Sequence, residues 1–274
     1  MAITIQDIAK LRKMSGAGLT DCKKALEETN GDFDKAMEII RTKGKAIAAK
    51  RSDRDAQEGC VLAAHTPGFA AVVSLQCETD FVAKNEGHIN LTKAILDIAM
   101  EKQPKSKEEL LALPIIDGRP VADHITDRIG TTGEKMELGS YEYLAAEHTT
   151  SYIHPGNKLA VIASFNENID ERMARNVAMQ IASMNPVAVS KEGVSQSVID
   201  EELKIAREKA IEQGKPENII DRIAEGALDK FFKENTLLRQ ALIMDNKVDV
   251  EAYLHSASKT LTCCDFKRVN LNED

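Results

Sequence analysis

A carboxylate and an aromatic ring stand side by side in the segment 77–85, which reads Cys-Glu-Thr-Asp-Phe-Val-Ala-Lys-Asn. This segment directly follows the apolar run Phe69–Leu75, which predicts a buried strand. Such a strand would present Asp80 and Phe81 on a sharp turn at its end, and functional side chains concentrate on loops that a rigid scaffold holds. Aromatic residues make up only 4% of the chain, so an aromatic ring on this turn is unusual for the protein. The placement indicates a functional turn without specifying its chemistry.

The sequence offers no motif for chemistry of its own. Gly16 and Gly18 lack the third glycine of a dinucleotide fingerprint and follow a predicted helix rather than a strand. No phosphate-cradling G-x-x-x-x-G-K-[ST] loop occurs, no serine lies in a G-x-S-x-G elbow, and His148 and His154 lack metal-ligand spacing. We therefore expect no catalytic residues, no metal site and no cofactor. A small-molecule enzyme with a hidden site remains the alternative, which turnover by the isolated protein would favour.

Composition and cysteine usage indicate a globular protein of the cytoplasm. The chain is 43% hydrophobic and 29% charged, and no apolar stretch approaches the ~20 residues that span a bilayer. The beginning of the sequence lacks the pattern of a secretory or mitochondrial presequence. The five cysteines form no C-x-x-C pair and are odd in number, which fits reduced thiols. We expect a cytoplasmic protein with no membrane contact.

Charge is spread unevenly along the chain. The net charge is −8, yet residues 1–54 contain twelve Lys and Arg against eight Asp and Glu. A wholly acidic protein would be a poor nucleic-acid binder. A basic module on an acidic body suits docking to an acidic protein surface. A solvated face with no partner accounts for the charges equally well.

Three short helices are predicted in the first 45 residues. Thr4 caps the first, Ser15–Gly18 separates it from the second, and Asn30-Gly31-Asp32 turns the chain into the third. Gly44 is expected to end the third helix. Helices this short form a miniature bundle of the ubiquitin-associated type, and residues 45–57 are expected to be a linker.

The rest of the chain predicts an α+β protein with antiparallel sheets. Thr66-Pro67-Gly68 indicates a β-hairpin, and further strands are expected at Leu138–Ala146, Ser151–His154, Leu159–Phe165 and Leu261–Val269. Phe69–Pro104 and Leu159–Pro186 form a faint internal repeat, which suggests two similar half-domains of which only the first carries the turn.

Residues 197–232 predict an antiparallel helical hairpin with narrow coiled-coil seams, because Gly214 and Pro216 separate two apolar stripes. The hairpin either packs on the body of the protein or projects toward a partner. The expected organisation is an N-terminal three-helix bundle, a two-part α+β core and this inserted hairpin. The boundaries are 1–54 for the bundle, 55–145 for the first half of the core, 146–196 and 233–274 for the second half, and 197–232 for the hairpin.

Two long segments resemble the signature stretches of the elongation factor Ts family. One, Leu11–Leu26, keeps the pattern L-R-x-x-[ST]-G-A-G-h-x-D-C-K-K-A-L, and the other, Cys77–Asn85, contains T-D-F-V. Shorter matches are Gly133–Met136, Ser151–His154 and Gln213–Pro216. Together these matches span nearly the whole chain.

The resemblance implies a guanine-nucleotide exchange factor that binds elongation factor Tu with its GDP, disturbs the Mg²⁺ site and promotes GDP release during translation elongation. The residues expected to act at the Mg²⁺ site are Thr79, Asp80, Phe81 and Val82. The residues expected to dock on the GTPase domain are Arg12, Leu19 and Thr20. Gly133 and His154 are expected as secondary contacts.

The resemblance further implies no enzyme activity, no cofactor, and no direct binding of nucleotide or nucleic acid. The hairpin is expected to reach elsewhere on the complex or to mediate self-association, which leaves a homodimer or a 2:2 complex open. Two alternatives compete with this interpretation. Phe81 would pack in the protein's own core while Asp80 caps the next helix, or the chain would be a helical-hairpin scaffold protein without exchange activity.

Overall fold

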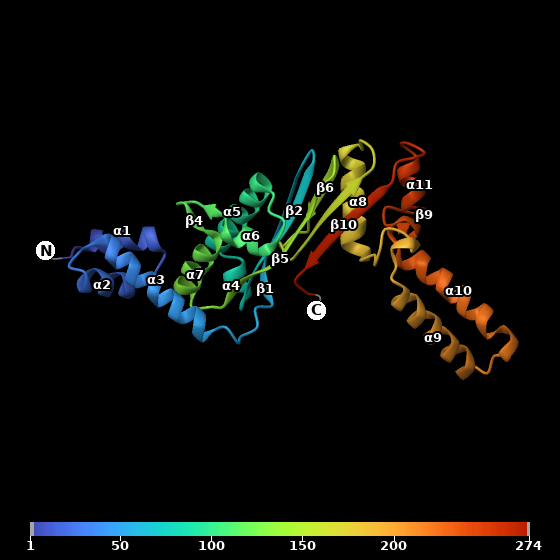
Figure 1. The fold of residues 1–274 in the computed structure, drawn as a ribbon, viewed down its shortest axis with the longest axis horizontal. Coiled ribbons are helices and arrows are strands. Elements are labelled where there is room, and N and C mark those ends of the chain that lie inside the picture. Colours follow the sequence, from blue (N-terminus) through green and yellow to red (C-terminus); the bar gives the residue numbers. More distant parts are fainter. Residues whose placement is uncertain (1–2, 273–274) are drawn as a thin grey trace.

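The computed structural model describes residues 3–272 and has the expected α+β class. The chain is elongated, with a helical bundle at one end, two sheets in the middle and a helical hairpin that projects at the other end (Figure 1). None of the described helices is long and apolar enough to cross a membrane.

The N-terminal bundle consists of α1 (Ile5–Ser15), α2 (Leu19–Glu28) and α3 (Phe33–Lys50). The predicted cap at Thr4 is confirmed: its side chain accepts a hydrogen bond from Asp7 N, and the Asp7 carboxylate accepts one from Thr4 N. This reciprocal pair satisfies two backbone donors at the start of the helix. The bundle has a small core of its own, formed by Leu11, Ala17, Cys22, Ala25, Leu26 and Ala36.

The expectation that Gly44 ends the third helix is wrong. α3 continues without a break to Lys50, and Gly44 is buried inside it. Its missing side chain lets α3 approach α7 (Val121–Thr132) closely. Residues 45–50 are therefore helical rather than part of a linker, and Ile47 and Ala48 pack on the core of the next domain. Local sequence could not reveal this, because the neighbour that Gly44 accommodates lies far along the chain.

The first half of the core pairs three strands in the order β1-β2-β5, all antiparallel. These strands are β1 (Glu58–Thr66), β2 (Phe69–Cys77) and β5 (Met136–Leu144). One face of the sheet packs against helices, with buried Phe69, Leu75, Ile95 and Ile125 in that cluster. The remaining elements of this half are α4 (Asp80–Ala83), α5 (Glu86–Lys102), α6 (Lys107–Ala112), β3 (Pro114–Ile115), β4 (Arg119–Pro120) and α7.

The second half repeats this plan with the strand order β10-β7-β6. Its strands are β6 (His148–Ile153), β7 (Leu159–Phe165) and β10 (Cys263–Asn270). The helix α8 (Glu171–Met184) begins after Asp170, whose carboxylate caps it. The smaller elements are η1 (Lys191–Gly193), η2 (Leu237–Arg239), β8 (Ala241–Leu242), β9 (Asp245–Asp249) and α11 (Val250–His255).

The two sheets pack face to face through small apolar side chains. Ala63, Ala70 and Val72 of the first sheet share a buried cluster with Ala160 and Ile162 of the second. Helices cover the outer face of each sheet, so the middle of the molecule has four layers, helix–sheet–sheet–helix (Figure 1). This arrangement places the far end of β2, where the predicted functional turn begins, at the junction with the N-terminal bundle.

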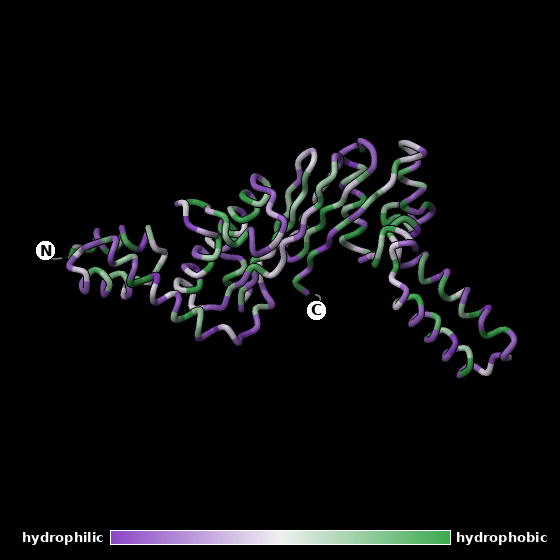
Figure 2. The backbone as a smooth tube through the Cα atoms, in the orientation of Figure 1, coloured by the Kyte–Doolittle hydropathy of each residue, from purple (hydrophilic) through white to green (hydrophobic). Residues whose placement is uncertain are grey.

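The predicted helical hairpin is present as α9 (Gln196–Glu212) and α10 (Glu217–Asn235). Both helices lie within the described residues, and their buried residues are Ala210 and Ala224. Small side chains therefore form the contact between the two helices, which is called the seam below. Arg207 Nε donates to Asp221 Oδ1 across the pair at 2.9 Å. Hydrophilic and hydrophobic residues alternate along both helices, whereas β2 and β7, the middle strands of the two sheets, are mostly hydrophobic (Figure 2). The hairpin is thus a projecting arm with a thin seam.

Candidate functional site

The turn after β2 is a short helix that exposes its ring. Thr79 caps α4, and its side chain accepts a hydrogen bond from Val82 N at 3.4 Å. Ala83 is buried and Val82 packs partly on the core, whereas the Phe81 side chain is 83% exposed. The inner face of α4 therefore anchors the turn while the outer face presents an aromatic ring to solvent. This exposure rules out the alternative in which Phe81 belongs to the protein's own core.

Asp80 does not serve as the cap of the next helix, because Asn85 caps α5 through Gly87 N. The Asp80 carboxylate instead accepts a hydrogen bond from Lys84 Nζ at 2.7 Å. This bond holds the pKa of the Asp80 carboxyl below its ordinary value, with a further contribution from the charge of Lys158. Asp80 is thus a charged group at the surface at neutral pH.

A hollow of about 190 Å³ separates the turn from the β6–β7 loop. Asp80 and Lys84 line one side of it, and Gly156 and Lys158 line the other. His154 is exposed where this loop begins, and its Nδ1 lies 3.0 Å from the Tyr152 hydroxyl. The structure therefore brings the loop that follows His154 beside the Asp80 turn, although the two segments are far apart in sequence.

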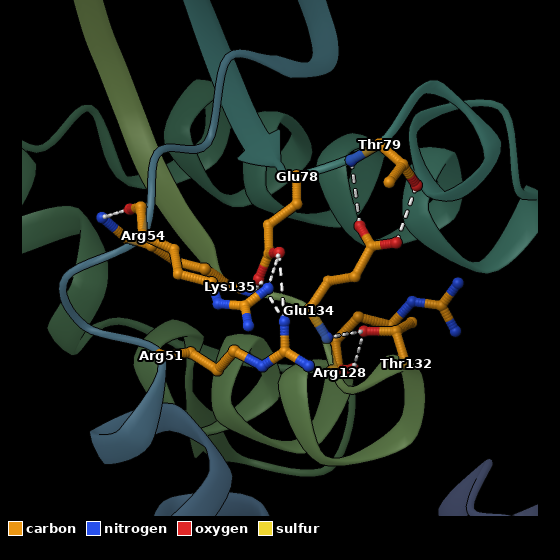
Figure 3. Close-up of polar contacts among 8 residues, drawn as sticks. All are labelled: Arg51, Arg54, Glu78, Thr79, Arg128, Thr132, Glu134 and Lys135. Atoms are coloured by element: carbon orange, nitrogen blue, oxygen red, sulfur yellow. Dashed lines mark hydrogen bonds and ion pairs between the residues drawn. The ribbon is translucent and has the colours of Figure 1, made fainter.

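Glu134 holds the start of the turn with both carboxylate oxygens. Thr79 N donates to Oε2 at 3.1 Å, and Thr79 Oγ1 donates to Oε1 at 2.7 Å (Figure 3). Glu134 follows Gly133, which ends α7 in the left-handed conformation with φ of 73°. Gly133 is thus placed where it directs the chain toward the turn.

Glu78 makes the matching contact in the opposite direction. Its carboxylate accepts from Lys135 N at 2.7 Å, from Arg51 at 3.0 and 3.1 Å, and from Arg54 at 3.0 Å (Figure 3). Burial alone would raise the pKa of the Glu78 carboxyl, but the hydrogen bonds from Lys135 N and the two arginines outweigh it and lower the pKa. Glu78 is therefore an ionised anchor between the chain after α3 and the turn.

Sequence reasoning missed the roles of Glu78 and Glu134. The segment Gly133–Met136 drew attention to Gly133, but the side chain that touches the turn belongs to the next residue. Glu78 lies next to the T-D-F-V segment, and this adjacency was the available signal. The partners of both carboxylates lie 24 to 57 positions away, so their pairing required the fold.

Arg12, Leu19 and Thr20 lie on either side of the turn that joins α1 to α2. Arg12 is in the last turn of α1, and Leu19 and Thr20 begin α2; all three are exposed. Gly16 adopts a left-handed conformation with φ of 69°, which turns the chain between the two helices. The three side chains therefore project from a compact corner of the bundle.

An open hollow of about 360 Å³ lies between that corner and the helices that follow the turn. It is lined by Met14 and Gly16 from the bundle, Gly87 and Asn90 from α5, and Ile116 from the β3–β4 hairpin. The exposed apolar side chains of Met14 and Ile116 contribute to it. The surface between the end of α1 and the start of α5 is thus concave. Among the described residues, no group of three or more His, Cys, Asp and Glu side chains is placed to hold a metal ion.

Comparisons with known proteins match this chain over nearly all of its length. A family model described as elongation factor TS matches residues 78–273 and so includes the turn. A protein named elongation factor Ts from Porphyromonas gingivalis is 68% identical over 274 residues, covering all of both chains. Proteins of the same name from Azobacteroides pseudotrichonymphae, at 54% identity over 99% of both chains, and Bacteroides fragilis, at 43% identity over all of both chains, are also similar.

Proposed function

The chain belongs to the elongation factor Ts family, and we propose that it is a guanine-nucleotide exchange factor that binds elongation factor Tu with its GDP and promotes GDP release during translation elongation. The observation that carries this proposal is the Phe81 ring, which is 83% exposed on a helix whose other face is anchored. Exposing an aromatic ring has a cost in water. A partner that covers the ring would recover that free energy.

In this proposal Arg12, Leu19 and Thr20 dock the bundle on the GTPase domain, and residues 79–82 act beside its magnesium. Arg12 offers a charge and Leu19 an apolar contact from one corner of the bundle. Gly133 and His154 would support the contact from either side of the turn. Binding energy gained at the bundle then holds Phe81 and Asp80 against the nucleotide site.

The proposed mechanism needs no contact with GDP itself. An exchange factor must bind the distorted or nucleotide-free GTPase better than the form that holds GDP and Mg²⁺. Magnesium requires near-ideal octahedral geometry, so a ring that displaces a neighbouring helix and a carboxylate that disturbs the bound waters both weaken its site. Linkage makes this antagonism reciprocal, because nucleotide must weaken factor binding by the same factor.

Release of labelled GDP from purified elongation factor Tu tests the proposal. The chain should accelerate release in a concentration-dependent manner, and heat-denatured chain should not. If release stays at its spontaneous rate at all concentrations, the exchange function is wrong. The helical-hairpin scaffold would then become the better candidate.

A further inference from the structure

We propose that Glu134 is a positioning residue for the exchange turn, and that together with Glu78 it couples the turn to helix α3 of the docking bundle. This inference rests on the proposed function, because it explains how binding at the bundle reaches Phe81. The set formed by Glu78, Thr79, Glu134 and Lys135 is called the carboxylate clasp below.

The hydrogen bonds of the clasp hold β2 and β5 together beyond the point where their backbone pairing ends. The last backbone pair between β2 and β5 is Cys77 with Met136. Beyond it, Thr79 N donates to the Glu134 carboxylate and Lys135 N donates to the Glu78 carboxylate. Each of the two segments therefore provides a carboxylate that accepts a hydrogen bond from a backbone N–H of the other segment. Hydrogen bonds to ionised acceptors are stronger than bonds between neutral groups, so the ends of the two strands are held firmly together.

The clasp also orients the cap of α4. The Thr79 hydroxyl has one proton, which points to Glu134 Oε1 at 2.7 Å. Its lone pairs are then free to accept from Val82 N. Without the carboxylate the hydroxyl can rotate, and the first turn of α4 loses a fixed acceptor. Since Phe81 is the second residue of this helix and its ring has little packing of its own, the direction of the ring depends on that turn.

Two connections join the clasp to the docking bundle. Arg51, which follows the last residue of α3, and Arg54 both donate to Glu78. The second connection runs through α7, which packs on α3 and ends one residue before Gly133 and two before Glu134. Lys135 Nζ adds a hydrogen bond to the Arg54 carbonyl oxygen at 2.8 Å. Functional groups keep their geometry when neighbouring side chains hold them in this way. These contacts connect the bundle to the turn through side chains and backbone on both sides of the clasp.

The test is Glu134→Gln, measured by labelled GDP release over a range of chain concentrations. Glutamine keeps the shape but has one acceptor oxygen, and its amide group would face a Thr79 donor. The maximal rate should fall about tenfold, equivalent to a loss of ~1.4 kcal/mol at the transition state. The half-maximal concentration should change less than ~2-fold, because the docking residues are untouched. The matched control is Glu142→Gln, an exposed glutamate on β5, the strand that begins two residues after Glu134, which should behave as the wild type.

The outcomes separate this inference from the proposed function. If the wild-type chain fails to accelerate release, the function is wrong. If the wild type is active and Glu134→Gln equals it, the positioning role is wrong and the function stands. An increase in half-maximal concentration at an unchanged maximal rate would also overturn the positioning role, because Glu134 would then act on affinity.

A second pair of variants covers the case in which Glu134→Gln does not fold. Thr79→Val removes the hydroxyl and keeps the shape, whereas Thr79→Ser keeps the hydroxyl. The clasp predicts a lower maximal rate for the valine variant and near wild-type exchange for the serine variant. Equal rates for both would overturn it. Where both single variants fold, the Thr79→Val, Glu134→Gln double variant should lose less than the sum of the two effects, since they remove one shared interaction.

Discussion

Gly44 and Gly130 meet where α3 crosses α7, and a Cβ atom on Gly130 would lie 2.8 Å from the Cα of Gly44. Carbon atoms that are not bonded to each other do not approach so closely, so the two helix backbones are in direct contact. A Cβ on Gly44 would in turn lie 3.2 Å from the Thr126 carbonyl oxygen. Two glycines thus set the distance between the N-terminal bundle and the core.

Gly130→Ala should destabilise the protein even though alanine favours helices. The added methyl meets backbone, and overpacking of this kind costs ~1–3 kcal/mol, which exceeds the ~1 kcal/mol gain in helix propensity. We expect a lower melting temperature and weaker stimulation of GDP release. Gly226→Ala is the control, because a Cβ there has no neighbour within 4 Å in the exposed helix α10. A stabilised Gly130→Ala variant would show that the helices can separate freely.

Phe81→Ala should leave the melting temperature nearly unchanged and slow GDP release by ~10- to 100-fold. The exposed ring contributes little to folding, whereas a decade of rate corresponds to ~1.4 kcal/mol of differential binding. Phe69→Ala is the contrast, since Phe69 is buried and its truncation should cost ~3–5 kcal/mol of stability. A large loss of stability with normal exchange for Phe81→Ala would end the wedge mechanism.

Asp80→Ala should slow GDP release in the same direction as Phe81→Ala. If the carboxylate acts by disturbing the magnesium site, its loss should matter less once magnesium has been removed by chelation. The measurement is labelled GDP release with and without chelator. An equal defect under both conditions would show that Asp80 acts on the GTPase independently of the metal.

Arg12→Ala and Leu19→Ala should show the reverse kinetic pattern from Glu134→Gln. Anchors of these types can each contribute ~1–2 kcal/mol to an interface, so the half-maximal concentration should rise about 5- to 30-fold. The maximal rate should be retained, because the turn is intact. Direct binding measurements with elongation factor Tu should show the same loss. Unchanged affinity for both variants would contradict the docking role of this corner.

Stability should decrease as the pH falls below about 6.5, in part because of His88. Burial lowers the pKa of this histidine, and the charge of Arg128 acts in the same direction. Its Nε2–H donates to the Leu75 carbonyl oxygen at 2.9 Å, and among the described residues Nδ1 has no partner. In the unfolded chain this histidine therefore binds a proton near pH 6.5, whereas in the folded chain it does so only at lower pH. The free energy of unfolding decreases as the pH falls from 6.5 to the lower pKa of the folded chain.

The corresponding measurement is chemical denaturation of the wild type and His88→Gln between pH 5 and pH 8, the range in which histidine titrates. Whatever its absolute stability, the variant should show a shallower dependence on pH. Glu78 will not confuse the result, because hydrogen bonds lower the pKa of its carboxyl and its contribution is lost only at more acidic pH. Identical slopes would show that His88 is not the group responsible.

Replacing residues 199–227 with a short Gly/Ser linker should preserve cooperative melting of the remainder. The seam buries Ala210 and Ala224, which pack on each other's helix, and the replacement keeps Asp229, whose carboxylate binds Arg239 at the base of the hairpin. We expect exchange to be reduced but not abolished. A molten product would mean that the hairpin belongs to the core.

Local signals predicted most elements well and long-range contacts poorly. The strand Leu159–Phe165 was predicted with its observed bounds, and Thr4 was correctly predicted as the cap of α1, because apolar runs and cap residues can be recognised from neighbouring residues. The prediction that Gly44 ends a helix was wrong because the role of this glycine is set by its contact with Gly130. The clasp escaped for the same reason: Thr79 and Glu134 are 55 positions apart, and no pattern within either segment specifies the other.

The way α4 is held has a consequence for how this protein can change over time. Because the clasp and Ala83 fix the backbone of the turn, the side chain at position 81 contributes little to the stability of the fold. In the proposed function, substitutions at this position change the rate of GDP release without destabilising the fold, so natural selection can tune exchange in small steps there. The same freedom makes position 81 a suitable place for a photo-crosslinking or fluorescent amino acid, which would report on the surface of the proposed partner.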